Sequence, residues 1–198
     1  MKFINLVKDI KNEEVFKISE SSEFFILGLE GGNLDVVFDL VQENISANIY
    51  VLILGDGNAE FKIKTKTIHS KPNSSSRVLI KGIFADQSRL DFEGMINIAS
   101  KAIGSDAYLQ NDNLVLSNDA IVNSSPQLEI ANDDVKASHG VTISTIDDLQ
   151  KFYLTSRGLL PELSENLLIK GFAVEVIEKI QDDRIMDLVS SFFKKYDW

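Results

Sequence analysis

The sequence predicts a mainly β protein with a small helical subdomain at its C-terminal end. Ten short segments between residues 14 and 144 are rich in Val, Ile, Phe and Thr, and Gly, Asn, Asp or Ser residues bound each of them. None of the connections between them reads as a crossover helix, which disfavours a doubly wound α/β fold. After Ser144 the apolar period changes from that of a strand to that of a helix. We therefore expect a β core over residues 1–144 and a helical subdomain over residues 145–198.

The β core begins with a short leading segment, residues 1–10, whose apolar residues fit either an amphipathic helix or a strand. The predicted strands that follow are 14–19, 23–29, 34–41, 47–55, 59–70, 77–85, 89–99, 107–117, 120–130 and 135–144. In the fifth of these, Lys62, Lys64 and Lys66 form a row of cations on one face. We interpret this row as a guard that keeps an exposed strand from pairing with another edge, in preference to a contact with an anion or an acidic partner.

The connections leave three all-β architectures open: a sandwich, a barrel and a solenoid. The segment 55–58, Gly-Asp-Gly-Asn, lies between two long alternating runs and is a credible hairpin turn, which a sandwich would use. Beyond residue 76 the short strands with Asn, Asp and Ser corners are typical of a β-helix, although no strict repeat is visible. The glycine groups 28–32 and 55–57 lack the Lys-Ser/Thr of a phosphate loop, so we assign no nucleotide site.

Three helices are predicted after the last strand. Thr145 followed by Asp148 fits an N-terminal cap, and this first helix should stop near Gly158. Pro161 suits the first turn of a second helix. The third helix has an apolar face made of Ile185, Leu188, Val189, Phe192, Phe193 and Tyr196. We expect the three helices to form a cap that closes the β body.

Composition and charge exclude several classes of function. The chain has 198 residues, a formal net charge of −10 and no cysteine. The negative charge argues against nucleic acid or an anionic membrane as the main partner. Without cysteine there are no disulfides, no thiolate-ligated zinc and no iron–sulfur cluster held by the chain's own thiolates. No apolar run approaches the roughly 18 residues of a membrane span and no signal-peptide core follows Met1, so we expect a cytoplasmic location.

The stretch 126–144, PQLEIANDDVKASHGVTIS, contains the best candidate for a functional side chain. Two alternating runs flank the turn cluster 132–134, and His139 lies in the second run on the same face as Ala137 and Val141. An imidazole on such a face is either a hydrogen-bonded packing residue or a ligand. The acidic residues of this stretch, Glu129, Asp133 and Asp134, fit a corner and an outward position better than a catalytic group. The other histidine, His69, has no partner motif.

This stretch resembles the signature of the SufB/SufD family, the β-helical scaffold proteins of the SUF iron–sulfur cluster assembly machinery. The resemblance continues upstream through KGIFADQSRLDFEGMINIASKAIGSDAYLQNDNLVLSNDA and downstream through LQKFYLTSRGLL and the pair Gly171-Phe172. It covers roughly residues 76–180, and the ASHG motif is closer to the SufD branch than to the SufB branch. Family members are usually about twice this long, so the chain looks like the core of such a protein.

The resemblance implies a right-handed parallel β-helix and a non-catalytic scaffold subunit. In that family the C-terminal helices dock a SufC-like ATPase, and the last strands pair the protein with a SufB-like paralogue or with a second copy. It also implies that His139 is a metal ligand shared with the partner, although Ala137 stands where some SufD-like proteins have cysteine. No cluster would be held stably by the chain alone, but a transient cluster would form in the complex. The side chains expected to contact a partner are Arg157, Phe172, Phe192 and Phe193, of which Phe172 and the last helix should meet the ATPase. Arg157 fits better an anchor for the carbonyls at the end of its helix.

Two other classes of function stay open at this point. The first is a β-helix lyase or hydrolase acting on carbohydrate, which would need a cleft lined by several carboxylates or basic residues on one face. The second is a self-assembling structural β-solenoid, which would lack a helical cap.

Overall fold

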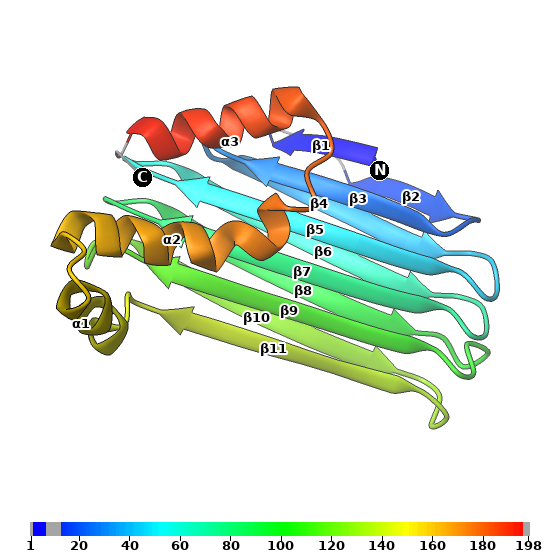
Figure 1. Cartoon of the computed structure of the whole chain (residues 1–198). Helices are drawn as coiled ribbons and strands as arrows, with labels where there is room; N and C mark the ends of the chain where they lie inside the picture. The colour runs from blue at the N-terminus through cyan, green and yellow to red at the C-terminus, as the bar shows by residue number, and fades with distance from the viewer. Residues whose placement is uncertain (1, 7–12, 196–198) are drawn as a thin grey trace.

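The computed structural model describes residues 2–6 and 13–195, and its strands wind into a parallel β-solenoid (Figure 1). The predicted fold, a parallel β-helix with C-terminal helices, is confirmed. Sheet A has six strands in the order β1-β3-β5-β7-β9-β11, and sheet B has five in the order β10-β8-β6-β4-β2. Sheet A consists of β1 (Lys2–Leu6), β3 (Ser22–Gly28), β5 (Ser46–Gly55), β7 (Ser75–Phe84), β9 (Asp106–Val115) and β11 (Lys136–Ser144). Sheet B consists of β2 (Glu14–Ile18), β4 (Gly32–Leu40), β6 (Glu60–His69), β8 (Arg89–Ile98) and β10 (Ile121–Ile130).

Successive strands after β2 alternate between the two sheets, so each connection is a corner of the coil. The segment 55–58 joins β5 of sheet A to β6 of sheet B, and β5 pairs in parallel with β3 and β7. The predicted hairpin is therefore wrong, because a hairpin needs its two strands to pair with each other. The leading segment is a strand, β1, which pairs with β3. The rest of that segment, residues 1 and 7–10, lies outside the described residues.

The corners repeat a backbone conformation, although the residue that adopts it differs from one corner to the next. Asn44, Asn73 and Gly104 all have positive φ, at 58°, 53° and 71°, a region that Asn and Gly tolerate better than other residues. The Asn44 N–H donates to the carbonyl of Pro72, and the Asn73 N–H donates to the carbonyl of Ile103, so these corners stack coil upon coil. At the opposite corner the Gly57 N–H donates to the Asp86 carboxylate at 2.9 Å across a sequence separation of 29. The repeat is structural, since Asn and Gly substitute for each other.

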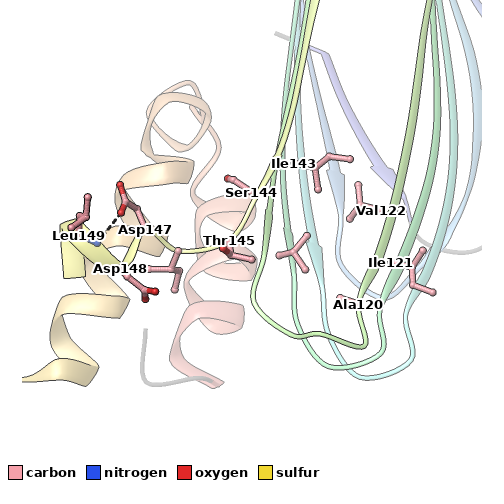
Figure 2. Close-up of a pocket in the computed structure, with 11 residues that line it drawn as sticks. Ala120, Ile121, Val122, Ile143, Ser144, Thr145, Asp147, Asp148 and Leu149 are labelled. Carbon is pink, nitrogen blue, oxygen red and sulfur yellow. Dashed lines mark hydrogen bonds between the residues drawn. The ribbon is translucent and has the colours of Figure 1, made fainter. Parts of the chain in front are cut away.

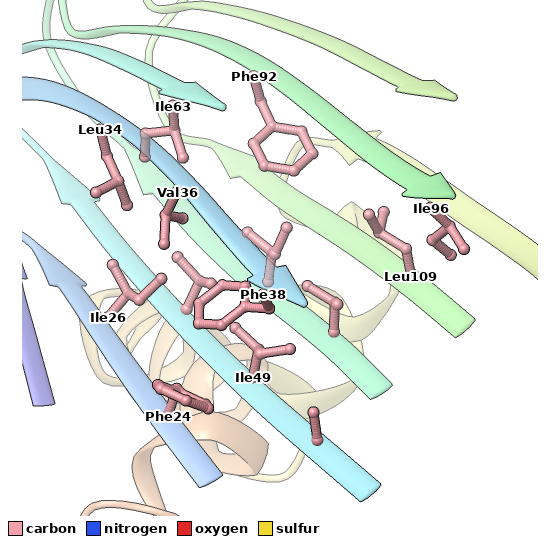
Figure 3. Close-up of a cluster of buried hydrophobic side chains, with 14 of the residues drawn as sticks. Phe24, Ile26, Leu34, Val36, Phe38, Ile49, Ile63, Phe92, Ile96 and Leu109 are labelled. Carbon is pink, nitrogen blue, oxygen red and sulfur yellow. The ribbon is translucent and has the colours of Figure 1, made fainter. Parts of the chain in front are cut away.

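The interior between the two sheets is apolar and follows the predicted alternation (Figure 3). In β6 the side chains of Phe61 and Ile63 are buried inside, whereas Lys62 and Lys64 are exposed on the outer face. Because β6 is a central strand of sheet B, the row of lysines cannot guard an edge, and that interpretation is wrong. Instead the Lys64 Nζ lies 2.9 Å from the carboxylate of Glu93 on the neighbouring strand β8.

The helices are α1 (Asp148–Ser156), α2 (Pro161–Ile177) and α3 (Asp183–Lys195). α1 is capped by Asp147, whose carboxylate accepts the Leu149 N–H at 2.8 Å, and not by Thr145 as predicted. It ends before Gly158, which has φ of 95°, and Pro161 begins α2 as expected. No helix in the described residues is long and apolar enough to cross a membrane. Tyr196, predicted to belong to the last apolar face, lies outside the described residues.

A second apolar core joins α2 and α3 to the outer face of sheet A (Figure 1). Leu52 and Leu54 of β5 point away from the solenoid interior and meet Ile169, Ala173 and other residues of the helices. The part of sheet A under these helices, including the end of β5, is therefore buried on both faces, which explains why β5 ends in a continuous apolar run. α2 and α3 cover a side of the solenoid, so the expectation that the helices cap the β body as a whole is wrong for these two.

Candidate functional site: the open end of the solenoid

The last coil of the solenoid, formed by β10 and β11, has no further coil stacked on it in the described part of the chain. In the described part of the chain β10 pairs only with β8, and β11 pairs only with β9, so one edge of each sheet has no further strand. The inward-facing side chains of this last coil have no coil stacked over them. Ile143 of β11 is 50% exposed, whereas Leu90 of β8 and Leu109 of β9, in the coil before, are buried. The free edges of β10 and β11 and their inward-facing apolar side chains, such as Ile143, therefore form one surface. We call this surface the open end.

A groove of about 890 Å³ lies between the open end and the start of α1 (Figure 2). Val122 of β10 and Ile143 of β11 project into the space between the two sheets, and Asp147 and Leu149 stand on the opposite side. Because Asp147 caps α1, its carboxylate has a structural partner. The groove therefore offers mainly apolar contacts, with polar groups along the side formed by α1.

His139 lies on β11 at the open end. Its register neighbour is Leu109, an interior residue of β9, so His139 shares the inward face with Ala137 and Val141 as the alternation predicts. The imidazole is exposed because no coil covers it. No three His, Asp or Glu side chains of the described residues come together as a metal site. A shared metal role for His139 stays a prediction.

The acidic residues near His139 occupy the positions expected of structural residues. Asp133 and Asp134 lie in the corner between β10 and β11, where the Asp134 N–H donates to the Asn132 side chain at 2.8 Å. Glu129 is exposed on the outer face of sheet B and accepts a hydrogen bond from Asn97 at 2.6 Å.

The other histidine, His69, is fully buried at a corner of the solenoid interior. Its Nδ1 lies 2.8 Å from the Ser74 hydroxyl and its Nε2 lies 2.8 Å from the Ser76 hydroxyl. Because the Ser74 hydroxyl donates its proton to the Lys71 carbonyl, it accepts from Nδ1–H, and Ser76 donates to Nε2. Burial lowers the pKa of His69 to about 4, so the ring is neutral at pH 7. The sequence showed no partner for His69 because the serines that bind it are small and common.

A polar group lies inside the solenoid next to the open end. Asn111 donates to the Ser124 hydroxyl at 2.8 Å, and Asn113 donates to the Asn111 carbonyl oxygen at 2.9 Å. The Asn113 side chain fits because its neighbour in β7 is Gly82, where a Cβ atom would lie 2.5 Å from Asn113 Oδ1. That oxygen is buried without a hydrogen-bond partner among the described residues.

A buried ionic cluster lies on the outer face of sheet A, beneath α2. Lys81 Nζ lies 2.9 Å from Asp112 and 3.4 Å from Glu175 of α2, and it lies 4.9 Å from the centre of the Phe172 ring. Asp112 also accepts hydrogen bonds from Gln110 and from Thr142, each at 2.6 Å. Burial opposes ionisation of Asp112, but these hydrogen bonds and the charge of Lys81 outweigh it and hold its pKa below the ordinary value.

The helices present a second uncovered apolar surface, which we call the helical surface. Leu149 and Phe152 of α1 are 77% and 70% exposed, and α1 buries none of its residues. The members of this surface on α1, on α2 and between them are Leu149, Phe152, Tyr153, Leu160, Leu163 and Leu167. The guanidinium of Arg157 lies 5.2 Å from the centre of the Tyr153 ring and is exposed beside this surface.

Phe172, Phe192 and Phe193, the aromatic residues expected to contact a partner, lie elsewhere. Phe192 and Phe193 are only 8% and 6% exposed, because α3 packs them into the second core. Phe172 is half-buried beside Lys81. The sequence could not separate these from the exposed aromatic residues of α1, because both sets follow the same helical period.

The fold and these surfaces define a parallel β-solenoid protein with two uncovered apolar surfaces, one at an open end and one on its helices. The sequence matches the family described as SUF system FeS cluster assembly, SufBD core domain, over residues 26–172. The chain belongs to this family.

Three similar proteins are also named for iron–sulfur cluster assembly. The chain is 38% identical over 168 residues to the iron–sulfur cluster assembly protein SufD of Escherichia coli (strain K12), an alignment that covers 85% of the chain and 40% of that protein. It is 32% identical over 155 residues to the SufBD family protein ycf24 of Trieres chinensis, covering 75% of the chain and 32% of that protein. The chloroplastic SufBD family protein ABCI8 of Arabidopsis thaliana is 31% identical over 134 residues, covering 68% of the chain and 24% of that protein. The chain thus spans two fifths or less of the length of these relatives.

Proposed function

We propose that the chain is a non-catalytic, SufD-like scaffold subunit of iron–sulfur cluster assembly. The observation that carries this proposal is the open end, where β10 and β11 leave unpaired strand edges beside apolar side chains. Strand edges of this kind add strands from another chain, and the exposed interior supplies apolar area for the same contact. The partner at the open end is a SufB-like paralogue, and a second copy is the alternative.

The iron–sulfur cluster is cargo in this proposal. The chain has no cysteine, so its residues supply imidazole but no thiolate. His139 lies at the open end, where a partner would bring its own ligands next to it. A cluster would therefore form transiently between the two chains, in the cytoplasm, and would not stay on this chain alone.

A SufC-like ATPase is the partner of the helical surface. Leu149 and Phe152 are exposed on one face of α1, and Leu163 and Leu167 extend the apolar surface along α2. Large apolar side chains that are exposed together on helix faces are typical of an interface. Arg157 is exposed beside it, so it remains a candidate contact, whereas Phe192 and Phe193 would support the surface from within the second core.

The rival functions have less support. A carbohydrate-active enzyme needs several carboxylates free to act in a cleft, but of the two aspartates that line the groove at the open end, Asp147 and Asp148, the first is engaged as a helix cap. A self-assembling solenoid stacks coils at both ends and needs no helical subdomain. In this chain a second apolar core packs α2 and α3 against the outer face of sheet A.

Co-purification with tagged partners tests the two surfaces separately. We expect Ile143→Lys to abolish capture by the SufB-like protein and to leave capture by the ATPase intact. Phe152→Ser should have the opposite effect. Val15→Ser, which changes a half-exposed apolar residue on the edge strand β2, serves as the control and should affect neither. If Ile143→Lys and Phe152→Ser both leave the two captures unchanged, the proposed surfaces are wrong.

A further inference from the structure

The ionic cluster under α2 forms a continuous path from a helix to the open end. Lys81, Asp112 and Thr142 are register neighbours on β7, β9 and β11, so their side chains stand in one row across three adjacent strands. Glu175 of α2 reaches the first member of this row, and β11 carries the last. The row therefore joins α2, which forms part of the helical surface, to the edge strand that carries His139.

In this cluster each buried charge is stabilised by its neighbour of opposite charge. The Lys81 and Asp112 side chains are only 10% and 11% exposed, and removal of one partner would leave a buried charge without its counter-ion. Asp112 accepts from Thr142 through one carboxylate oxygen and from Lys81 and Gln110 through the other. Lys81 and Thr142 are thus held by the two oxygens of one carboxylate, which links the position of Lys81 to that of Thr142.

We infer that Lys81 and Asp112 are positioning residues that couple the seating of α2 to the order of edge strand β11. When α2 is seated, Glu175 and Asp112 share Lys81, and Asp112 in turn fixes Thr142. When α2 shifts, Lys81 loses one of its two carboxylates and β11 loosens. This inference rests on the proposed function, because the two elements that it couples, α2 and β11, belong to the helical surface and to the open end.

Hydrogen exchange of the full chain without partners tests the coupling. Glu175 has a half-exposed side chain, so Glu175→Gln removes its charge without disturbing the core. We expect amide exchange in β11 to become about two- to fivefold faster, in keeping with the loss of a partly exposed ion pair. The matched control is Glu165→Gln, which removes the ion pair between Glu165 of α2 and Lys151 of α1. It shows whether the loss of any ion pair of α2 loosens β11, or only the loss of the pair with Lys81.

Substitutions at Lys81 separate charge from packing. Lys81→Met should speed β11 exchange by about tenfold or more, because Asp112 loses its buried cation, and Lys81→Arg should restore the rate to within about twofold of the parent. Thr142→Val combined with Glu175→Gln should give a smaller effect than the two single effects multiplied, as expected of residues in one network.

The inference fails if Glu175→Gln leaves β11 exchange unchanged, or if Glu165→Gln loosens β11 as much as Glu175→Gln does. It also fails if Lys81→Arg behaves like Lys81→Met, since packing alone would then explain the effect. These outcomes concern the isolated chain, so they leave the docking surfaces untouched. Conversely, a failure of co-purification would refute the partners and leave the coupling standing.

Discussion

Acidification should destabilise the protein through His69, and the size of the effect follows from its burial. The pKa of the ring is about 4 in the folded protein, against 6.5 for an exposed histidine. Between these values the unfolded chain binds a proton that the folded chain does not, so stability is complete above pH 6.5 and falls toward pH 4. With about 1.4 kcal/mol for each pH unit of separation, the loss at pH 5.0 is about 2 kcal/mol and its ceiling is about 3 kcal/mol.

Urea unfolding followed by circular dichroism at pH 7.5 and pH 5.0 measures this loss. The chain has only two histidines, so two variants assign the effect. His69→Gln keeps groups that can bond to Ser74 and Ser76 but does not titrate, and it should lose most of the pH dependence. His139→Gln should keep it, because His139 is exposed. The reasoning is refuted if His69→Gln has the same pH dependence as the parent, or if the His69 proton resonance titrates near pH 6.5.

Further predictions concern the polar interior and the open end. Gly82→Ala should destabilise the protein by about 1–3 kcal/mol, because the new methyl group would lie 2.5 Å from Asn113 Oδ1, and its melting temperature should fall. Gly171→Ala has nothing within 4 Å and lies in α2, so it should be neutral or stabilising by up to about 1 kcal/mol; the opposite ranking would contradict the packing described. His139→Ala should change the free energy of unfolding by less than about 0.5 kcal/mol while lowering cluster assembly in the reconstituted complex; a larger loss of stability would mark a packing residue. The isolated chain, reconstituted anaerobically with iron and sulfide and then desalted, should keep no visible absorbance, and stoichiometric retention would overturn the shared-ligand proposal.

The strands could be predicted from the sequence, but their pairing could not. Alternation in β6 separates Phe61 and Ile63 from the lysines correctly, because burial of one face is a local property of a strand. The corner at residues 55–58 was predicted as a hairpin because its residues suit either turn, and only the partners of β5 distinguish the two.

The candidate site was predicted in part for the same reason. The inward position of His139 follows from alternation, but its exposure depends on whether another coil covers β11. The burial of Phe192 and the exposure of Phe152 depend on whether each helix meets the apolar outer face of sheet A. The cluster around Asp112 joins residues as far apart as Lys81 and Glu175, and no local pattern contains that information.

The burial of β5 on both faces has a consequence for the register between neighbouring coils. In the second half of β5 the side chains from Val51 to Leu54 are all fully buried, so within that half a slip of one residue would exchange one apolar face for another at little cost. The same slip in β6 would place Lys62 and Lys64 inside the solenoid and Phe61 in water. Sheet A opposes such a slip only where an outward polar residue such as Lys81 interrupts its apolar runs, whereas β6 opposes it through its lysines. Substitutions that remove the alternation of β6 should produce misaligned chains, whereas changes to the outward apolar residues of β5 should chiefly weaken its contact with the helices.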